Sequence, residues 1–135
     1  MAITKDAIDA GLERGHTIDI TTTGRRTGKA RRIEIVFHNI GGRIEIVFHN
    51  IGGRIYISGL PRTQKRDWLL NLEADPHFTF HLKGRTRADL PAVARVIDDE
   101  AERRDVLPHV ARNWRRNDLE QMVRYSPLIE VAFPQ

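Results

Sequence analysis

An eleven-residue unit, R-I-E-I-V-F-H-N-I-G-G, occurs twice in direct succession, at Arg32–Gly42 and at Arg43–Gly53, without a single difference. Apolar and polar residues alternate within each copy, so that in the first copy Ile33, Ile35 and Phe37 share one face. Alternation with a period of two, closed by a pair of glycines, predicts a half-buried β-strand followed by a turn. We interpret the repeat as a recent or engineered duplication, because a repeat that had drifted would show substitutions.

The duplication constrains the topology, since one extra strand and turn reverse the direction of everything downstream. If Asn39–Gly42 forms a four-residue loop, the first copy pairs with the second through Phe37 with Ile44, Ile35 with Ile46 and Ile33 with Phe48. Either copy could occupy the place of one strand, and the surplus copy must then add to an edge or pair with another molecule. We expect a strand-exchanged homodimer. The alternative is a monomer that extrudes the surplus copy as a loop and exposes its large apolar side chains, at about 1.5 to 3 kcal/mol each.

The length of 135 residues suits one domain, residues 1–135. The absence of cysteine excludes disulfides, thiolate catalysis and cysteine-ligated metals. The beginning, M-A-I-T-K-D, has no apolar signal core, and no apolar run approaches the roughly 20 residues that span a bilayer. We therefore expect a cytoplasmic protein without a membrane partner. The net charge of +4 favours anionic partners.

The remaining elements alternate between short strands and helices. We expect an N-terminal helix from Thr4 to about Gly15, a helix at Lys65–Ala74, a helix from Asp98 that is kinked or broken near Pro108, and a short helix at Asp118–Tyr125. Further strands are predicted at 17–23, 54–58, 77–82, 86–97 and 128–133, and Pro91 implies an edge or a bulge. Six short strands joined mostly by hairpins, plus the duplicate, favour an α+β fold that is mainly β: a small antiparallel barrel with flanking helices.

A cationic loop precedes the repeat. Between Arg25 and Arg32 there are five cations and no acid, with Gly24 and Gly28 allowing the backbone to turn closely. Such a cluster suits a phosphate or a carboxylate, and a solvated hairpin loop is the alternative. Nucleic acid would also be attracted, but the interleaved aromatic residues of a single-strand binder are missing, so we expect no nucleic-acid partner.

Two other chemistries are not expected. His77 and His81 share a face of one strand, but four residues separate them by about 13 Å, which is too far for one metal ion. No metal is therefore assigned. Ser58-Gly59 lacks the G-x-S-x-G context of a nucleophilic serine.

Three segments together carry a resemblance. The loop T-T-T-G-R-R-T-G-K-A-R, the segment L-P-R-T-Q-K-R-D-W-L-L-N-L-E-A-D-P and the final strand I-E-V-A-F resemble the deazaflavin-dependent nitroreductase family. This family belongs to the split β-barrel oxidoreductases that are related to flavin-dependent pyridoxamine phosphate oxidases. The resemblance extends from about Asp19 to Phe133.

The resemblance implies a six-stranded split β-barrel that binds the reduced deazaflavin coenzyme F420 and passes its hydride to a small electrophilic substrate, with FMN as the alternative cofactor. Carried over by position, three arginines would bind the phosphate and the acidic tail of the coenzyme, namely Arg25, Arg26 and Arg31, with Lys29 close by. The backbone of Ile57, Ser58 and Gly59 would approach the ring. Lys65 and Trp68 would lie at the polar edge of the ring. The family's C-terminal helical segment carries tyrosines that contact substrate. Here only Trp114 and Tyr125 stand as counterparts.

Two other functions remain open at this stage. One is a non-catalytic binding protein for a small amphipathic anion such as a fatty acid, suggested by the missing tyrosines. The other is an engineered strand-duplicated form of the reductase. The sequence does not identify the electron acceptor.

Overall fold

Six antiparallel strands close into a barrel in the order β1-β2-β5-β8-β7-β6 in the computed structural model, which describes residues 5–14, 17–40, 46–47, 50–51, 54–83 and 87–134. The barrel strands are β1 (Thr17–Thr23), β2 (Ala30–Ile40), β5 (Arg54–Ser58), β6 (His77–Leu82), β7 (Ala88–Val96) and β8 (Leu128–Ala132). The barrel closes where β1 pairs with β6, with Ile20 opposite Phe80. The predicted α+β fold with a six-stranded antiparallel barrel is thereby confirmed.

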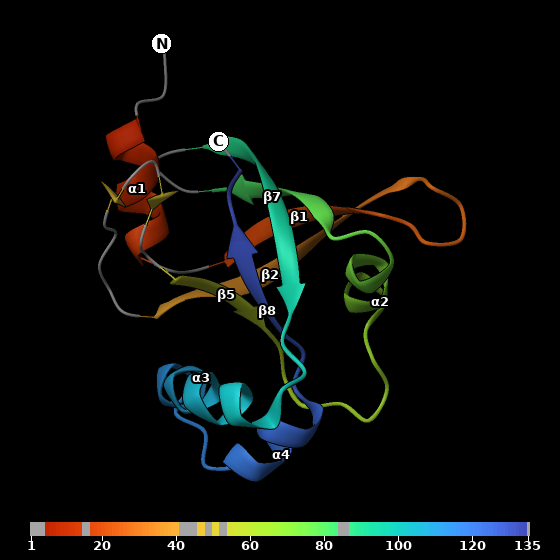
Figure 1. Cartoon of the computed structure of the whole chain (residues 1–135), viewed down its shortest axis with the longest axis vertical. Coiled ribbons are helices and arrows are strands. Elements are labelled where there is room, and N and C mark those ends of the chain that lie inside the picture. The colour runs from red at the N-terminus through yellow and green to blue at the C-terminus, as the bar shows by residue number, and fades with distance from the viewer. Residues whose placement is uncertain are drawn as a thin grey trace.

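The described residues form four helices around the barrel, namely α1 (Lys5–Arg14), α2 (Asp67–Ala74), α3 (Glu100–Asn113) and α4 (Leu119–Tyr125). Figure 1 shows α3 and α4 together at one end of the molecule, whereas α2 lies beside the long hairpin that joins β1 and β2. In the described part of the chain, no helix is long and apolar enough to cross a membrane.

The period-two pattern of the strands determines what is buried. Ile18 and Ile20 of β1 and Phe80 of β6 are fully buried, and Phe37 of the first repeat copy packs edge-to-face on Phe80 with ring centroids 5.2 Å apart. Each such side chain contributes about 1.5 to 3 kcal/mol on burial. A second apolar cluster, around Leu107 of α3 and Met122 of α4, joins these helices to the barrel.

The two repeat copies do not pair with each other as predicted. β2 contains the first copy and pairs with β5, with Phe37 opposite Ile57 and Ile40 opposite Arg54. Ile46 of the second copy pairs instead with Ile51, in a separate two-stranded sheet of β3 (Ile46–Val47) and β4 (Asn50–Ile51). The predicted pairing of Ile35 with Ile46 is therefore wrong. Ile44 and Phe48, the predicted partners of Phe37 and Ile33, lie outside the described residues. By pairing within itself the second copy reverses the chain an extra time, so that β5 still runs antiparallel to β2. Residues 41–45, 48–49 and 52–53 lie outside the described residues, and exchange between two chains stays a prediction.

Two prolines test the expectations about backbone continuity. The helix was predicted to be kinked or broken near Pro108. α3 continues through Pro108 to Asn113, so the break is wrong, whereas the kink stays a prediction. The lost helical hydrogen bond is offset by the burial of residues on both sides of the proline, among them Leu107 and Val110. Pro91 pairs with Thr79 of β6 but lies outside the Val93–Val96 stretch of β7 that pairs with β8. It therefore lies at a local edge, where its missing N–H costs no ladder hydrogen bond.

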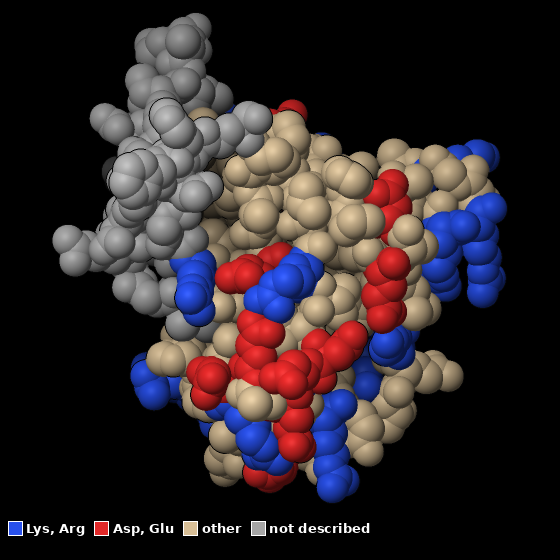
Figure 2. All heavy atoms as spheres, in the orientation of Figure 1, with Lys and Arg blue, Asp and Glu red and all other residues tan. Residues whose placement is uncertain are grey.

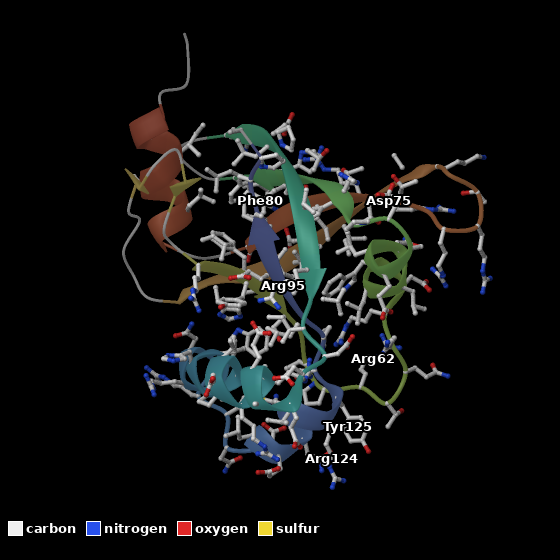
Figure 3. The ribbon with its side chains drawn as sticks, viewed as in Figure 1. Arg62, Asp75, Phe80, Arg95, Arg124 and Tyr125 are labelled. Atoms are coloured by element: carbon white, nitrogen blue, oxygen red, sulfur yellow. The ribbon has the colours of Figure 1, made fainter. Side chains whose placement is uncertain are left out.

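A buried arginine fastens α4 to α3. The Arg103 guanidinium donates to the carbonyl oxygens of Ile97, Met122, Val123 and Ser126, at 2.8, 3.2, 2.8 and 2.5 Å. These carbonyls satisfy the cation although no carboxylate is bonded to it. On the outer surface, Arg95 of β7 binds Glu102 of α3 and Glu130 of β8 (Figure 3). Together these contacts fix the segment that leads from α4 into β8.

We predict that deleting residues 43–53 leaves the barrel intact. The deletion joins Gly42 to Arg54, and because Ile40 already pairs with Arg54, Gly41-Gly42 would become a two-residue hairpin loop, for which Gly-Gly is suited. The shorter connection should raise the free energy of unfolding by about 1 kcal/mol or more. Urea denaturation measures this change, and a variant that fails to fold would show that the barrel needs the second copy.

The same variant is the control for strand exchange. If the second copy links two chains, light scattering should report a dimer for the full sequence and a monomer for the deletion variant. A full-length protein that is monomeric at high concentration would contradict the exchange.

We also predict that His38 makes the protein less stable in mild acid. His38 is 3% exposed, its Nδ1 lies 3.1 Å from Asn113 Nδ2, and burial lowers its pKa to about 4. In the unfolded chain His38 binds a proton near pH 6.5, whereas in the folded protein burial keeps it neutral until about pH 4. The free energy of unfolding is therefore highest above pH 6.5 and falls as the pH falls toward 4. Between pH 7 and 5 the loss should be about 2 kcal/mol. Urea denaturation at several pH values should show a shallower pH dependence for His38→Leu, and no such change for His109→Gln on the exposed side of α3.

Candidate functional site

A cavity of about 650 Å³ lies between the β1–β2 hairpin and the start of α2, and we call it the hairpin cavity. Its walls come from the end of β1, the hairpin loop, the start of β2, the loop before α2 and the first turns of α2. The lining residues are Thr22, Gly24, Arg25, Arg26, Thr27, Arg31, Ile33, Arg62, Arg66, Asp67, Trp68 and Asn71.

The hairpin loop is closed by its own backbone. Gly24 N donates to Lys29 O and Gly28 N donates to Gly24 O, both at 2.8 Å. Gly28 has a φ of 70°, which favours glycine, and a Cβ on Gly24 would lie 3.1 Å from Lys29 O. The tight backbone leaves the cationic side chains pointing outward, and Figure 2 shows Lys and Arg side chains gathered on this projecting hairpin at the right of the view.

Asn71 ties the hairpin to α2. Its Oδ1 accepts hydrogen bonds from Arg25 N at 3.1 Å and Arg25 Nη1 at 2.9 Å, and its Nδ2 donates to Thr22 Oγ1 at 3.3 Å. Arg25 also contacts the carboxylate of Asp67 at 3.3 Å, where the Asp67 side chain is 88% exposed. Arg25 is therefore a structural link as well as a cation of the cavity.

The cavity carries more positive charge than its own acids neutralise. Five arginines line it, and its one carboxylate, Asp67, is already paired with Arg25. Arg26, Arg31, Arg62 and Arg66 form no ion pair within the part of the chain that the structure describes. Burial, followed by the nearby Arg62 charge, lowers the pKa of Arg66. A bound anion would relieve this repulsion.

The helix α2 adds to the same field. Its N-cap residue, Arg66, makes no side-chain capping bond, and the first two helical residues, Asp67 and Trp68, line the cavity. The positive end of the helix dipole thus lies at the cavity wall, which favours an anion there.

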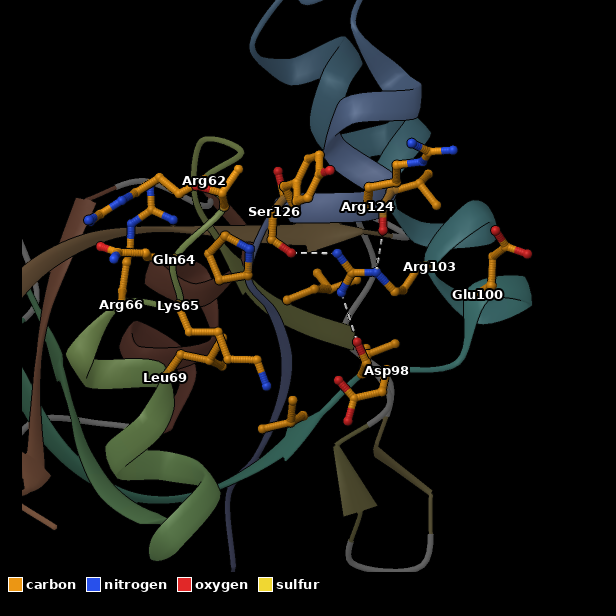
Figure 4. Close-up of a pocket in the computed structure, with 17 residues that line it drawn as sticks. Arg62, Gln64, Lys65, Arg66, Leu69, Asp98, Glu100, Arg103, Arg124 and Ser126 are labelled. Atoms are coloured by element: carbon orange, nitrogen blue, oxygen red, sulfur yellow. Dashed lines mark hydrogen bonds between the residues drawn. The ribbon is translucent and has the colours of Figure 1, made fainter.

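A second cavity, of about 430 Å³, lies between the loop before α2 and the α3–α4 end of the molecule, and we call it the helix cavity (Figure 4). Arg62 and Arg66 line both cavities and so form their common wall. Arg62 N donates to Tyr125 O at 3.2 Å, which holds the loop against the end of α4. The other lining residues are Thr63, Gln64, Lys65, Leu69, Val96, Ile97, Asp98, Glu100, Arg103, Val123, Arg124, Tyr125, Ser126, Pro127 and Leu128.

The structure brings part of the predicted coenzyme site together. Four of the predicted residues line the hairpin cavity, namely Arg25, Arg26, Arg31 and Trp68. Lys29 belongs to the loop without lining either cavity, and Lys65 lines the helix cavity with its Nζ held 2.9 Å from Glu73. Tyr125, a predicted substrate contact, also lines the helix cavity and is 39% exposed.

The predicted ring segment lies behind the wall between the cavities. Ile57 is fully buried in the core, and Ser58 Oγ donates to Pro127 O at 2.7 Å, so neither side chain lines a cavity. A Cβ on Gly59 would lie 3.2 Å from Arg66 Cζ, so a side chain there would displace this guanidinium. Trp114 packs edge-to-face on His38, with ring centroids 5.0 Å apart, and lines neither cavity.

Four site residues were missed by the sequence reasoning: Arg62, Arg66, Asn71 and Ser126. The cations of R-T-Q-K-R before α2 are visible in the sequence and could have suggested Arg62 and Arg66. Asn71 belongs to the segment L-P-R-T-Q-K-R-D-W-L-L-N-L-E-A-D-P that carries the family resemblance, but no role was assigned to it. No signal in the sequence points to Ser126 as a binding residue, since its importance depends on what lies next to it in space.

The sequence of the chain matches one known protein family. A family model described as F420H(2)-dependent quinone reductase matches residues 6–131. No curated protein matches the chain.

Several solved structures share the fold. The conserved hypothetical protein Rv2991 from Mycobacterium tuberculosis is 16% identical with a TM-score of 0.71, over 100% of this chain and 83% of that one. The heme storage protein HutZ from Vibrio cholerae is 12% identical with a TM-score of 0.65, over 97% and 90%. An FAD-binding protein from Mesorhizobium loti is 10% identical with a TM-score of 0.60, over 98% and 91%. Identities this low show a common fold.

We predict that Asn71→Ala loosens the hairpin from α2. The substitution leaves Arg25 N and the 2%-exposed Thr22 without their partner, which should cost about 1 to 3 kcal/mol of unfolding free energy. The matched control is Asp67→Asn, which removes only an exposed ion pair and should change stability by less than about 1 kcal/mol. Thermal unfolding followed by circular dichroism measures both, and equal effects of the two substitutions would contradict a special role for Asn71.

Proposed function

Because the chain belongs to the F420H(2)-dependent quinone reductase family, we propose that it binds the deazaflavin coenzyme F420 and passes a hydride from the reduced form to a small electrophilic organic acceptor. The hairpin cavity carries this proposal, since it holds five arginines and a tryptophan around a volume of about 650 Å³ with one carboxylate in its lining. A phosphodiester with an acidic tail is the kind of group that such a surplus of guanidinium groups binds.

The residues present fit the anionic part of the coenzyme. Arg26 and Arg31 line only the hairpin cavity and have no acidic partner within the described residues, so they would hold the phosphate and the acidic tail. Arg25, held by Asn71, would shape the loop and add its charge, with Lys29 at the outer edge. Trp68, which is 8% exposed, would give the ring an apolar wall.

The bound reduced coenzyme supplies the hydride, and no nucleophile from the protein is required. The chain's own task is to bind, to orient and to exclude water. Ser58 Oγ is occupied by Pro127 O, and the segment Ile57–Gly59 lines neither cavity. The backbone contact between this segment and the ring, which the family resemblance implies, therefore stays a prediction. The Lys65 ammonium, held by Glu73, would act near the polar edge of the ring through its charge.

The other functions and the other cofactor that the sequence left open are supported to different degrees. The family match favours a reductase over a non-catalytic carrier of a fatty acid. FMN remains the alternative cofactor, and the FAD-binding protein of similar fold is a reason to test flavins. We further propose that the enzyme acts in the cytoplasm as a homodimer, exchanged through the duplicated segment.

We predict that F420 binds to the purified protein and that Arg26→Ala combined with Arg31→Ala weakens binding about 100-fold or more, because two charge-assisted contacts are lost. Coenzyme fluorescence titration measures this, and affinity should fall as salt is raised. The control is Arg112→Ala, which removes one positive charge from an exposed position of α3 outside both cavities and should leave the affinity nearly unchanged.

The same titration, carried out with F420 and with FMN, shows which of the two cofactors the protein binds more tightly. Failure of F420 to bind to the unaltered protein would refute the proposed function, and tighter binding of FMN than of F420 would replace the coenzyme.

A further inference from the structure

The helix cavity contains a polar group that the protein leaves unsatisfied. Ser126 is 3% exposed, and its Oγ has no hydrogen-bond partner among the described residues although its backbone carbonyl accepts from Arg103. Leaving a buried hydroxyl unpaired costs stability. The Ser126 Oγ has almost no accessible surface, but because Ser126 belongs to the cavity lining, a rotation of its side chain would turn the hydroxyl toward a ligand.

Three cations of the same cavity form no ion pair within the described residues, namely Arg62, Arg66 and Arg124, whereas Lys65 is held by Glu73 and Arg103 is saturated by carbonyl oxygens. Of these three, Arg62 and Arg66 lie close to each other at one end of the cavity. Two adjacent guanidinium groups repel each other unless an anion lies between or beside them. They also form the wall toward the hairpin cavity, which is the side from which a coenzyme would approach.

Charge is distributed unevenly along the helix cavity. Figure 4 shows Arg62 and Arg66 on one side, and Asp98 and Glu100 on the other together with Arg103 and Arg124, with Ser126 between the two sides. The carboxylates of the cavity thus lie on one side only. A ligand with a negative group at one end therefore has one favoured orientation, with that group toward the arginines and away from the carboxylates.

The remaining walls suit a flat apolar body. Leu69, Val96, Pro127 and Leu128 line the cavity, and the ring of Tyr125 is 39% exposed beside them. An exposed aromatic ring next to aliphatic walls is a common setting for a planar ligand.

We propose that the helix cavity is the acceptor site and that it selects flat, unsaturated acceptors bearing a carboxylate, which is held by Arg62, Arg66 and the Ser126 hydroxyl. The identification of the ligand as the acceptor rests on the proposed function, whereas the anion site itself does not. A neutral acceptor of the same shape would leave the two guanidinium groups and the hydroxyl unpaired, and so would bind more weakly.

The test uses a matched pair of probes on the full chain without coenzyme. 2-Naphthoate carries the carboxylate, and 2-naphthamide has the same body without the charge. Isothermal titration calorimetry should show naphthoate binding at least about tenfold more tightly than the amide. Arg66→Gln should remove about tenfold of the naphthoate affinity and little of the amide affinity, and Arg112→Gln should change neither.

Ser126→Ala separates binding from structure. Because Ser126 Oγ has no protein partner to lose, the melting temperature should stay the same or rise while naphthoate affinity falls about fivefold. A fall in melting temperature with unchanged naphthoate affinity would mean that the hydroxyl serves the fold, and would remove it from the site.

Two further outcomes locate the probe and keep the proposals apart. Arg26→Gln with Arg31→Gln should weaken F420 and leave naphthoate unchanged, and loss of naphthoate instead would place the probe in the hairpin cavity and overturn the acceptor site. Equal affinity for naphthoate and the amide, or binding of neither, also overturns it. If naphthoate binds as expected and F420 does not, the proposed function fails while the anion site stands.

Discussion

The amide of Asn71 joins the two segments that make the hairpin cavity, and the geometry of the candidate site depends on it. Its oxygen holds the backbone and the guanidinium of Arg25, and its nitrogen holds the buried Thr22 hydroxyl. Without this contact the hairpin would be a projecting cationic loop in solvent, with no reason to face α2. The amide makes the link because its oxygen accepts and its nitrogen donates, which an apolar residue of that size could not do. Three hydrogen bonds of Asn71, together with the exposed Arg25–Asp67 ion pair, thus hold the hairpin against α2.

The same contact also gathers positive charge that no carboxylate neutralises around the two cavities. Once the hairpin is held against α2, the loop cations and the arginines before α2 surround one volume, and Arg62 and Arg66 face a second volume on their other side. Like charges are held together by the fold, and the free energy this costs is available to any anion that enters. A coenzyme with an acidic tail and an acidic acceptor on opposite sides of one arginine wall is an arrangement in which both ligands relieve repulsion, and the unsatisfied Ser126 hydroxyl favours the acceptor side.

The duplication shows how a closed barrel accepts an extra strand unit. In a closed barrel each strand already pairs with two neighbours, so a seventh strand between β2 and β5 would have to break their pairing. It would also add one chain reversal, which would leave β5 parallel to β2. The described part of the second copy pairs with itself, Ile46 with Ile51, and the barrel registers remain continuous. The sequence argument paired the two copies because both are apolar on the same face, but Arg54–Ser58 offers the same alternation and ends with β5 in contact with β8. Long-range closure therefore outweighed the nearest available partner.

The sequence by itself determined the class of fold and the place of the cations. Period-two alternation marked six barrel strands, and the glycines of the hairpin together with an acid-free run of Arg and Lys marked an anion site, because both signals are local. Only the tertiary structure decided which copy of the repeat enters the barrel, which arginines share a cavity, and that Asn71 and Ser126 matter. These depend on atoms that are far apart in the chain. Asn71 lies 46 residues from Arg25, and Ser126 lines one cavity with Arg62 and Arg66 because the end of α4 is hydrogen-bonded to the loop before α2. A pattern along the chain carries no record of such contacts, because they are set by how the barrel closes.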